Sequence, residues 1–171
     1  MPDSLPWERR HKILEPADLP GLRDRVAGRR MVFASGCFDV FHAGHAVFFD
    51  QCRALGEVLV AGVGRDSYIR RMKGPSRPVN PETNRIYLVA ALESVDFAVL
   101  TNDPPPGETD ITGLLRAMRP HVLALTEGDT DTIAQEKSLC LDLGIELVIV
   151  PRVAPDGIAL TSSTAILDKG A

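Results

Sequence analysis

The sequence lacks three features that would assign it to whole classes of protein: a long apolar run, a dense set of cysteines and an excess of positive charge. Its 171 residues include three cysteines, an odd and sparse count that argues against a disulfide framework and indicates a reducing compartment. No apolar run approaches the length needed to cross a bilayer, and residues 1–12 lack the apolar core of a signal peptide. We therefore expect a cytoplasmic protein with no membrane partner.

The shortage of positive charge limits the possible partners. The formal net charge is −4, and acidic and basic residues are interspersed along the chain. Nucleic-acid-binding modules usually carry a basic stripe, so we expect no nucleic-acid partner. A local cluster of cations can still bind a small anionic ligand. With 44% hydrophobic and 25% charged residues, the composition is that of a globular protein long enough to bury a core.

The pattern of apolar residues predicts a short extension followed by one α/β domain. Residues 1–29 are broken up by four prolines, and residues 18–26 have the spacing of a short amphipathic helix. From residue 30 to residue 171, apolar runs alternate with helical stretches. The runs that predict buried strands are 31–35, 58–63, 97–100, 121–125 and 145–150.

The stretches between these runs complete the predicted fold. We expect helices over 43–55, 111–118 and 132–143, a helix capped by Asn80 with Pro81 as its first residue, and a last helix from Ser162 or Ser163 to residue 168. Residues 103–107, with three consecutive prolines, predict an exposed loop. Strands that are apolar on both faces and alternate with helices indicate a Rossmann-like, doubly wound parallel sheet of five strands with helices on both faces. Such a sheet binds ligands at the carboxyl ends of its strands.

The segment 36–45, GCFDVFHAGH, lies between the first predicted strand and the next helix, where that ligand crevice forms. Gly44 carries no side chain at the helix start, so a phosphate could approach the backbone amides there. His42 and His45 are three residues apart and share one face of a helical turn. Two imidazoles on one face can donate hydrogen bonds to the oxygens of a single phosphate group.

A zinc site is the alternative for this segment, with Cys37, the two histidines and Cys52 as ligands. Cys52 falls on the apolar face of the predicted helix, and the spacing of the four residues matches no zinc template known to us. Phosphate binding is therefore the better interpretation.

Four motifs in order resemble one family. The segment 36–45 resembles the GxFDxxHxGH signature of the cytidylyltransferase-like nucleotidyltransferases, a branch of the HIGH superfamily. The stretch 73–81, KGPSRPVNP, is similar to one in the heptose-1-phosphate adenylyltransferase domain and is followed at the same distance by Arg85. Residues 91–96 and 162–166 match two further elements of that domain. The resemblance extends from about residue 12 to the end of the chain, and it implies a homodimer.

The resemblance also implies a role for each matching residue. His42 and His45 would contact the triphosphate, Lys73 would bind phosphates of one or both substrates, and Arg85 would hold the β- and γ-phosphates. These four are the expected catalytic residues. Two glycine-containing loops and the start of the last helix would bind the rest of the nucleotide through Gly36, Cys37, Phe38, Asp39, Gly44, Gly128, Asp129, Ser162, Ser163 and Thr164.

Some of these residues also have structural interpretations that need no ligand. Asp39 follows a strand, where an aspartate commonly fixes a turn through backbone hydrogen bonds. Phe38 is interpreted as a core residue, Lys73 as a residue of a Gly/Pro-rich loop and the run 162–164 as a helix cap.

The chemistry of nucleotidyl transfer agrees with the implied roles. The nucleophile is a phosphate oxygen that is already ionised at neutral pH, so no general base is required. Catalysis reduces to alignment and to neutralisation of charge on the transferring group and the leaving pyrophosphate. We expect Mg²⁺ to enter with the nucleoside triphosphate through its phosphates, with no side chain assigned as a metal ligand.

The loop after the fourth predicted strand departs from the heptose pattern, because Thr126 replaces a lysine and Glu127 a glycine. This leaves the base and the acceptor open, and it fits a stand-alone enzyme without a fused sugar kinase. The first interpretation is transfer of AMP from ATP to a sugar 1-phosphate, with a heptose as first choice. The alternative is a CTP-dependent enzyme acting on glycerol 3-phosphate, another alcohol phosphate or a phosphonate. A non-catalytic nucleotide-binding sensor is the alternative from another class.

Overall fold

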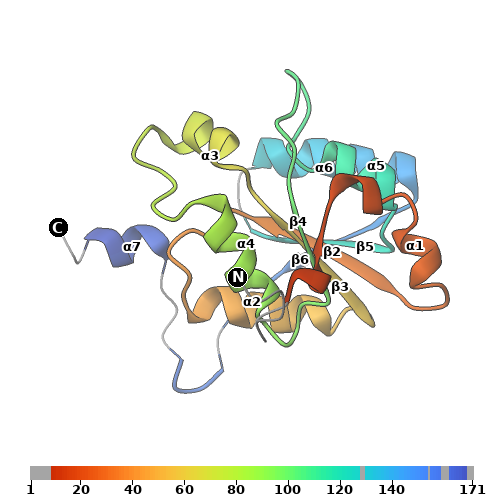
Figure 1. Cartoon of the computed structure of the whole chain (residues 1–171), viewed down its shortest axis with the longest axis horizontal. Coiled ribbons are helices and arrows are strands. Elements are labelled where there is room, and N and C mark those ends of the chain that lie inside the picture. Colours follow the sequence, from red (N-terminus) through yellow and green to blue (C-terminus); the bar gives the residue numbers. More distant parts are fainter. Residues whose placement is uncertain (1–8, 128–129, 154, 159–161, 169–171) are drawn as a thin grey trace, which may run out of the picture.

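A parallel sheet of six strands forms the centre of the computed structural model, which describes residues 9–127, 130–153, 155–158 and 162–168 (Figure 1). The strand order is β1-β4-β3-β2-β5-β6, and every neighbouring pair is parallel. All five expected strands are present, which confirms the doubly wound α/β fold. Their bounds are β2 Met31–Gly36, β3 Val58–Val63, β4 Phe97–Leu100, β5 Val122–Thr126 and β6 Glu146–Val150.

The predicted strand count of five is wrong by one, because a short strand in the N-terminal extension joins the sheet. This strand, β1 Ile13–Leu14, places Ile13 opposite Ala98 and Leu14 opposite Val99 of β4. Two residues are too few to show the alternation by which a strand is recognised in a sequence. The pairing depends on an edge that β4 presents only once the sheet has formed.

The helices follow the predicted alternation with the strands. Two 3₁₀ turns, η1 Arg9–Lys12 and η2 Pro16–Asp18, precede the main domain. The α-helices are α1 Leu22–Arg25, α2 Ala43–Arg53, α3 Asp66–Lys73, α4 Glu82–Ala90, α5 Thr112–Met118, α6 Thr130–Leu143 and α7 Ser163–Asp168. The proline-rich loop between β4 and α5 is exposed, as expected, and projects away from the sheet (Figure 1).

Two helix predictions need correction. Helix α3 was not predicted: most of its eight residues are charged or polar, and Ile69 is its one buried residue. Lys73 is therefore the last residue of a helix and does not lie in a loop. Helix α4 begins one residue later than expected: Pro81 has an extended ψ of 154° and occupies the capping position, and Asn80 precedes it.

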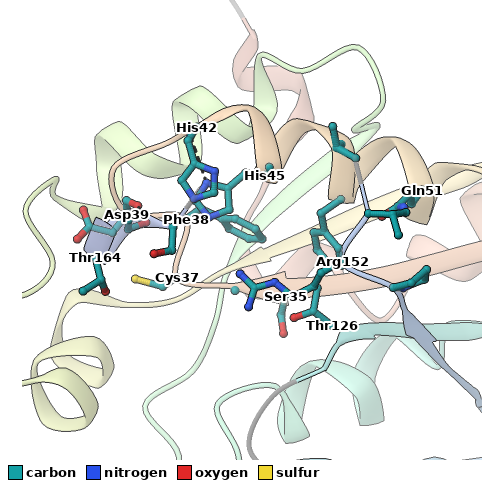
Figure 2. Close-up of a pocket in the computed structure, with 18 of the residues that line it drawn as sticks. Ser35, Cys37, Phe38, Asp39, His42, His45, Gln51, Thr126, Arg152 and Thr164 are labelled. Atoms are coloured by element: carbon teal, nitrogen blue, oxygen red, sulfur yellow. Dashed lines mark hydrogen bonds between the residues drawn. The ribbon is translucent and has the colours of Figure 1, made fainter. Parts of the chain in front are cut away.

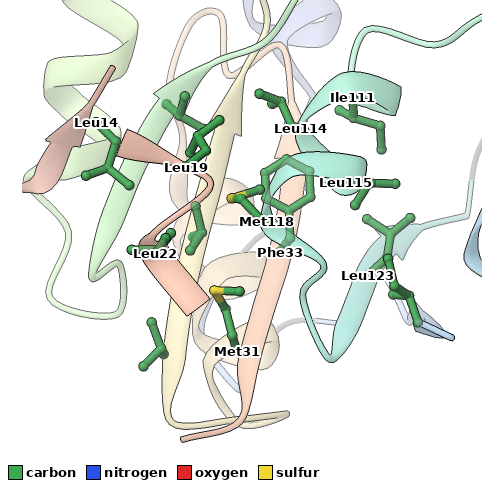
Figure 3. Close-up of a cluster of buried hydrophobic side chains, with 14 of the residues drawn as sticks. Leu14, Leu19, Leu22, Met31, Phe33, Ile111, Leu114, Leu115, Met118 and Leu123 are labelled. Atoms are coloured by element: carbon green, nitrogen blue, oxygen red, sulfur yellow. The ribbon is translucent and has the colours of Figure 1, made fainter. Parts of the chain in front are cut away.

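Helices cover both faces of the sheet, as predicted, and divide the core into two clusters. On one face, side chains of α1, α5 and α6 pack against the sheet together with Met31 of β2, and Figure 3 shows Phe33 of β2 among Leu114, Leu115 and Met118 of α5. On the other face, α2 and α4 pack against it through residues that include Phe49, Cys52, Ile86 and Val89. Within the described residues, no helix is long and apolar enough to span a membrane.

The described part of the N-terminal extension packs against the first of these clusters. Leu14, Leu19, Leu22 and Val26 are all at most 5% exposed and belong to the same core as Phe33. The expected short helix is present as α1. The domain boundary at residue 30 stays a prediction, but burial of these four side chains shows that residues 13–26 fold with the sheet.

Candidate active site

A cavity of about 300 Å³ opens at the carboxyl ends of β2, β5 and β6, where the fold predicts a ligand site (Figure 2). Its walls come from the turn between β2 and α2, the first turns of α2, the end of α3 and the start of α7. Eleven of the fourteen site residues expected from the sequence line it together: Gly36, Cys37, Phe38, Asp39, His42, Gly44, His45, Lys73, Ser162, Ser163 and Thr164.

The turn between β2 and α2 folds back on itself around Phe38. A Cβ on Gly36 would lie 3.0 Å from the Phe38 ring, so a larger residue there would displace the ring. Phe38 and Val40 both have a left-handed φ, 50° and 49°, which side chains rarely adopt. The Phe38 ring packs on Phe49 at a centroid distance of 4.7 Å and meets the His45 ring edge-on at 5.4 Å. Phe38 is therefore a core residue that also supports a histidine of the cavity.

His42 and His45 form a stacked pair, with ring centroids 3.8 Å apart and planes 21° from parallel. The His42 backbone N–H lies 3.4 Å from His45 Nδ1 and donates to it. Because Nδ1 accepts this bond, neutral His45 carries its proton on Nε2, which leaves Nε2–H as a donor for a ligand. The Nδ1 atom of His42 is buried and has no hydrogen-bond partner among the described residues.

Both imidazoles are held in the neutral form at pH 7. Burial lowers the pKa of His45 to about 4, and the positive charges of His42, Lys73 and Arg152 add to the effect. Burial, followed by the charge of Arg152, also lowers the pKa of His42. The pair can therefore donate hydrogen bonds without carrying two like charges at van der Waals distance. An anionic ligand would raise both pKa values again.

Three cations line the same cavity, and sequence reasoning assigned a role only to Lys73. Arg152 follows the last residue of β6 by two positions and is exposed, and Figure 2 shows its guanidinium directed into the cavity. Arg77 Nη1 lies 3.2 Å from Asp39 Oδ2, within ion-pair distance but without hydrogen-bond alignment. The available signal for Arg152 was its place at the carboxyl end of a predicted strand. Gln51 of α2 also lines the cavity, and no sequence signal marked it.

Arg85 is not brought to the cavity, contrary to the role expected for it. Its side chain is fully buried and is not among the lining residues. Its guanidinium donates to the backbone carbonyls of Asn80, Cys37 and Gly64 and to the Asp66 carboxylate, at 2.6 to 2.9 Å. A direct phosphate contact would require Arg85 to leave these acceptors.

The start of α7 reaches the cavity through its serines. Ser162 caps the helix, since its Oγ accepts a bond from the Ala165 N–H at 3.1 Å, and the Ser163 hydroxyl donates to the Asp39 carbonyl. Thr164 is exposed and lies on the opposite side of the cavity from Arg152 (Figure 2). Gly128 and Asp129, expected near the base and ribose, lie outside the described residues.

The lining residues do not form a binding site for Mg²⁺ by themselves. Among the described residues that line the cavity, Asp39 supplies the one carboxylate, and its oxygens already accept the backbone N–H groups of Val79 and Asn80. No group of three or more potential metal ligands occurs in the described part of the chain. Mg²⁺ prefers several oxygen ligands, so a magnesium ion fits here only with the oxygens of a polyphosphate.

Comparisons with known proteins place the chain in a family. The sequence model of the cytidylyltransferase-like family matches residues 33–133. The chain is 36% identical over 146 residues to the bifunctional protein HldE of Trichlorobacter lovleyi, covering 85% of this chain and 28% of that protein. It is 46% identical over 101 residues to HldE of Alcanivorax borkumensis, covering 58% and 20%. The chain thus spans between 20% and 28% of the length of these relatives.

Solved structures share the fold. A lipopolysaccharide core biosynthesis protein from Thermoplasma volcanium superimposes with a TM-score of 0.60 at 31% identity, covering 75% of this chain and all of that one. Pantoate-beta-alanine ligase from Francisella tularensis gives a TM-score of 0.61 at 17% identity, covering 91% of this chain and 75% of that one. The second likeness shows the fold alone.

Proposed function

The chain belongs to the cytidylyltransferase-like family, and from this premise we propose that it transfers a nucleoside monophosphate from a nucleoside triphosphate to a phosphorylated small molecule and releases pyrophosphate. One observation carries the proposal. A stacked pair of neutral histidines shares a cavity with Lys73, Arg77 and Arg152. This arrangement suits a polyphosphate that gains negative charge on its bridging and terminal oxygens.

The reaction needs no nucleophilic side chain and no general base from the protein. An oxygen of the acceptor phosphate attacks the α-phosphorus and forms the new P–O bond. The bond from the α-phosphorus to the α,β-bridging oxygen breaks, and pyrophosphate leaves with that electron pair. His45 Nε2–H donates to an oxygen that gains charge, while Lys73 and Arg152 lower the energy of the leaving pyrophosphate. Mg²⁺, entering with the nucleotide, would supply further charge neutralisation.

We propose ATP and a sugar 1-phosphate, with a heptose first, as the substrates. The four motifs resemble the heptose-1-phosphate adenylyltransferase domain, and a 31% identical structure is named as a lipopolysaccharide core biosynthesis protein. CTP with an alcohol phosphate is the second candidate. It is favoured by Thr126, which lines the cavity at the position where the heptose pattern carries a lysine.

A substrate panel tests the proposal. The purified protein is incubated with Mg²⁺, each of ATP, CTP, GTP and UTP, and each of several sugar 1-phosphates, glycerol 3-phosphate, phosphocholine and phosphonates. Pyrophosphate release with ATP and a heptose 1-phosphate, with the product confirmed by mass, is the expected result. Release with CTP and an alcohol phosphate would replace the substrate assignment. Nucleotide binding without release from any acceptor would favour the sensor, and no nucleotide binding would overturn the proposal.

We also propose that the protein acts as a homodimer in the cytoplasm. Tyr87 and Leu88 on α4 are 41% and 44% exposed, which offers apolar surface for a second copy, and the three cysteines are free. Light scattering after size-exclusion chromatography should give twice the mass of one chain. Leu88→Glu should reduce that mass, whereas Leu141→Glu, at a 75% exposed position on α6, should not.

A further inference from the structure

A buried aspartate, Asp39, joins the turn before α2 to the loop between α3 and α4. Asp39, 1% exposed, sits in the turn that leads to His42. Its two carboxylate oxygens accept the backbone N–H groups of Val79 and Asn80, each at 2.9 Å. Its Oδ1 also lies 3.1 Å from the Val40 N–H and accepts from it. The aspartate therefore ties the 36–42 turn to the 74–81 loop, 40 residues further along the chain.

Arg85 also connects these two segments, through hydrogen bonds from its buried guanidinium. Its Nη1 donates to the Cys37 carbonyl at 2.6 Å, in the turn, and its Nε donates to the Asn80 carbonyl at 2.9 Å, in the loop. Its Nη2 donates to the Gly64 carbonyl at the end of β3 and to Asp66 Oδ1 at the start of α3. A planar fork with five N–H donors can meet four acceptors in fixed directions, which an ammonium group cannot.

We propose that Asp39 and Arg85 are positioning residues that act as one clamp, and that neither of them touches a phosphate group. The clamp fixes His42 and His45, which follow the turn, relative to Lys73, which precedes the loop, and Arg77, which lies in it. It sets these donors at the spacing required by the transferring phosphates before a substrate binds. This inference rests on the proposed nucleotidyl transfer.

The backbone of the turn shows why a clamp is needed. Phe38 and Val40, on either side of Asp39, both adopt a left-handed φ, a conformation that non-glycine residues leave unless their surroundings hold them. Each buried charge is compensated by short, directed bonds, so the clamp is rigid as well as charged. Because alignment supplies much of the rate in phosphoryl transfer, a shift of about 1 Å between the two loops would cost on the order of 10²-fold in rate.

The Arg85→Lys variant distinguishes a clamp from a direct phosphate contact. Lysine keeps the positive charge that a phosphate contact needs but lacks the planar fork that the carbonyls of three segments need. Arg85→Lys should therefore lower kcat by about 10²-fold and leave KM for the triphosphate within about threefold. Hydrogen exchange of peptides covering 36–42 and 74–81 should become faster. Arg70→Lys, at an exposed position on α3, is the matched control and should change none of these values.

Asp66→Asn gives a milder version of the same experiment in case Arg85→Lys folds poorly. Asp66 is 20% exposed and forms one of the four bonds to Arg85, so a smaller fall in kcat with unchanged KM is expected. For either variant, a KM increase of about tenfold or more with kcat and exchange unchanged would overturn the clamp in favour of a phosphate contact. A kcat of Arg85→Lys within threefold of the wild-type value, or a kcat of Asp66→Asn equal to the wild-type value, would overturn it as well.

The hydrogen-exchange arm keeps this inference separate from the proposed reaction. If the wild-type protein fails to release pyrophosphate with every acceptor in the panel, the proposed function fails. Hydrogen exchange in the two segments, 36–42 and 74–81, still reports on the clamp. Faster exchange in Arg85→Lys would then retain the clamp as a structural feature, and unchanged exchange would reject it.

Discussion

The two faces of the sheet differ in how their buried charged side chains are compensated. On the face of α2 and α4, Arg85 is 0% exposed and Asp39 is 1% exposed, and directed hydrogen bonds satisfy both of them. On the face of α5 and α6, Glu136 is 5% exposed and forms no ion pair within the described residues. Burial, together with the nearby Asp110 carboxyl, raises the pKa of Glu136 to about 7. Burial also raises the pKa of Asp110.

The two faces differ in whether their buried charged groups have partners. Burying an ion costs several kcal/mol unless partners compensate it, and the clamp has such partners on three segments of chain. Glu136 forms no ion pair within the described part of the chain, and its burial and the Asp110 carboxyl raise its pKa to about 7, close to physiological pH. The stability of the face of α5 and α6 should therefore depend on pH near neutrality.

Removing the compensated charge should have the largest effect. Arg85→Met leaves Asp66 and three carbonyls without their donor, so the free energy of unfolding should fall by about 3–5 kcal/mol in urea denaturation. Arg70→Met, at an exposed position on the neighbouring helix, is the control and should lie within about 0.5 kcal/mol of wild type. A loss below about 1 kcal/mol would show that the two faces do not differ as described.

Removing a ligand-facing donor should affect turnover without affecting the fold. His45→Ala deletes Nε2–H, and loss of one such donor lowers kcat by about 10²–10³-fold, or roughly 3–4 kcal/mol. Circular dichroism should show an intact fold. Steady-state pyrophosphate release measures the effect, and a normally folded, fully active variant would reject the phosphate contact assigned to His45.

Neutralising Glu136 should stabilise the protein at high pH. Because its pKa in the folded state lies above the unfolded value of 4.5, the stability it contributes is present below about pH 4.5, declines as pH rises and is gone above about pH 7. Glu136→Gln should therefore raise the free energy of unfolding at pH 8, by at most about 3 kcal/mol, and leave it nearly unchanged at pH 4. Equal effects at the two pH values would contradict the assignment of a neutral buried acid.

The smallest expected effect concerns protons in the cavity. The pKa of His45 in the folded state, about 4, is below its ordinary value of 6.5, so the stability it contributes is present above pH 6.5 and is lost as pH falls towards 4. A bound triphosphate should raise this pKa and draw a fraction of a proton from solution near pH 5. Calorimetry in two buffers of different ionisation enthalpy measures the uptake. The His45→Gln variant should take up fewer protons when it binds the triphosphate. Equal proton uptake by the variant and the wild type would assign the proton to another group.

The sequence by itself determined the parallel α/β fold, five of the strands and the place of the cavity. Apolar runs such as 58–63 identify buried strands because both faces are covered, and the order of elements then places the 36–45 segment at a carboxyl edge. Eleven of the fourteen expected site residues line the cavity because most of them belong to two continuous motifs. Residues of one continuous motif lie close together in the fold, so finding the motif finds most of the lining residues.

Only the tertiary structure decided where Arg85 and Arg152 lie and that β1 joins the sheet. A helical arginine has the same local pattern whether it faces a phosphate or the carbonyls of several segments, and the carbonyls of Cys37 and Gly64 reach Arg85 only in the folded chain. Arg152 became a cavity residue because β6 places it beside the turn that follows β2. The two residues of β1 are a strand only because β4 offers them an edge. Each of these depends on long-range contact, which no local pattern of residues encodes.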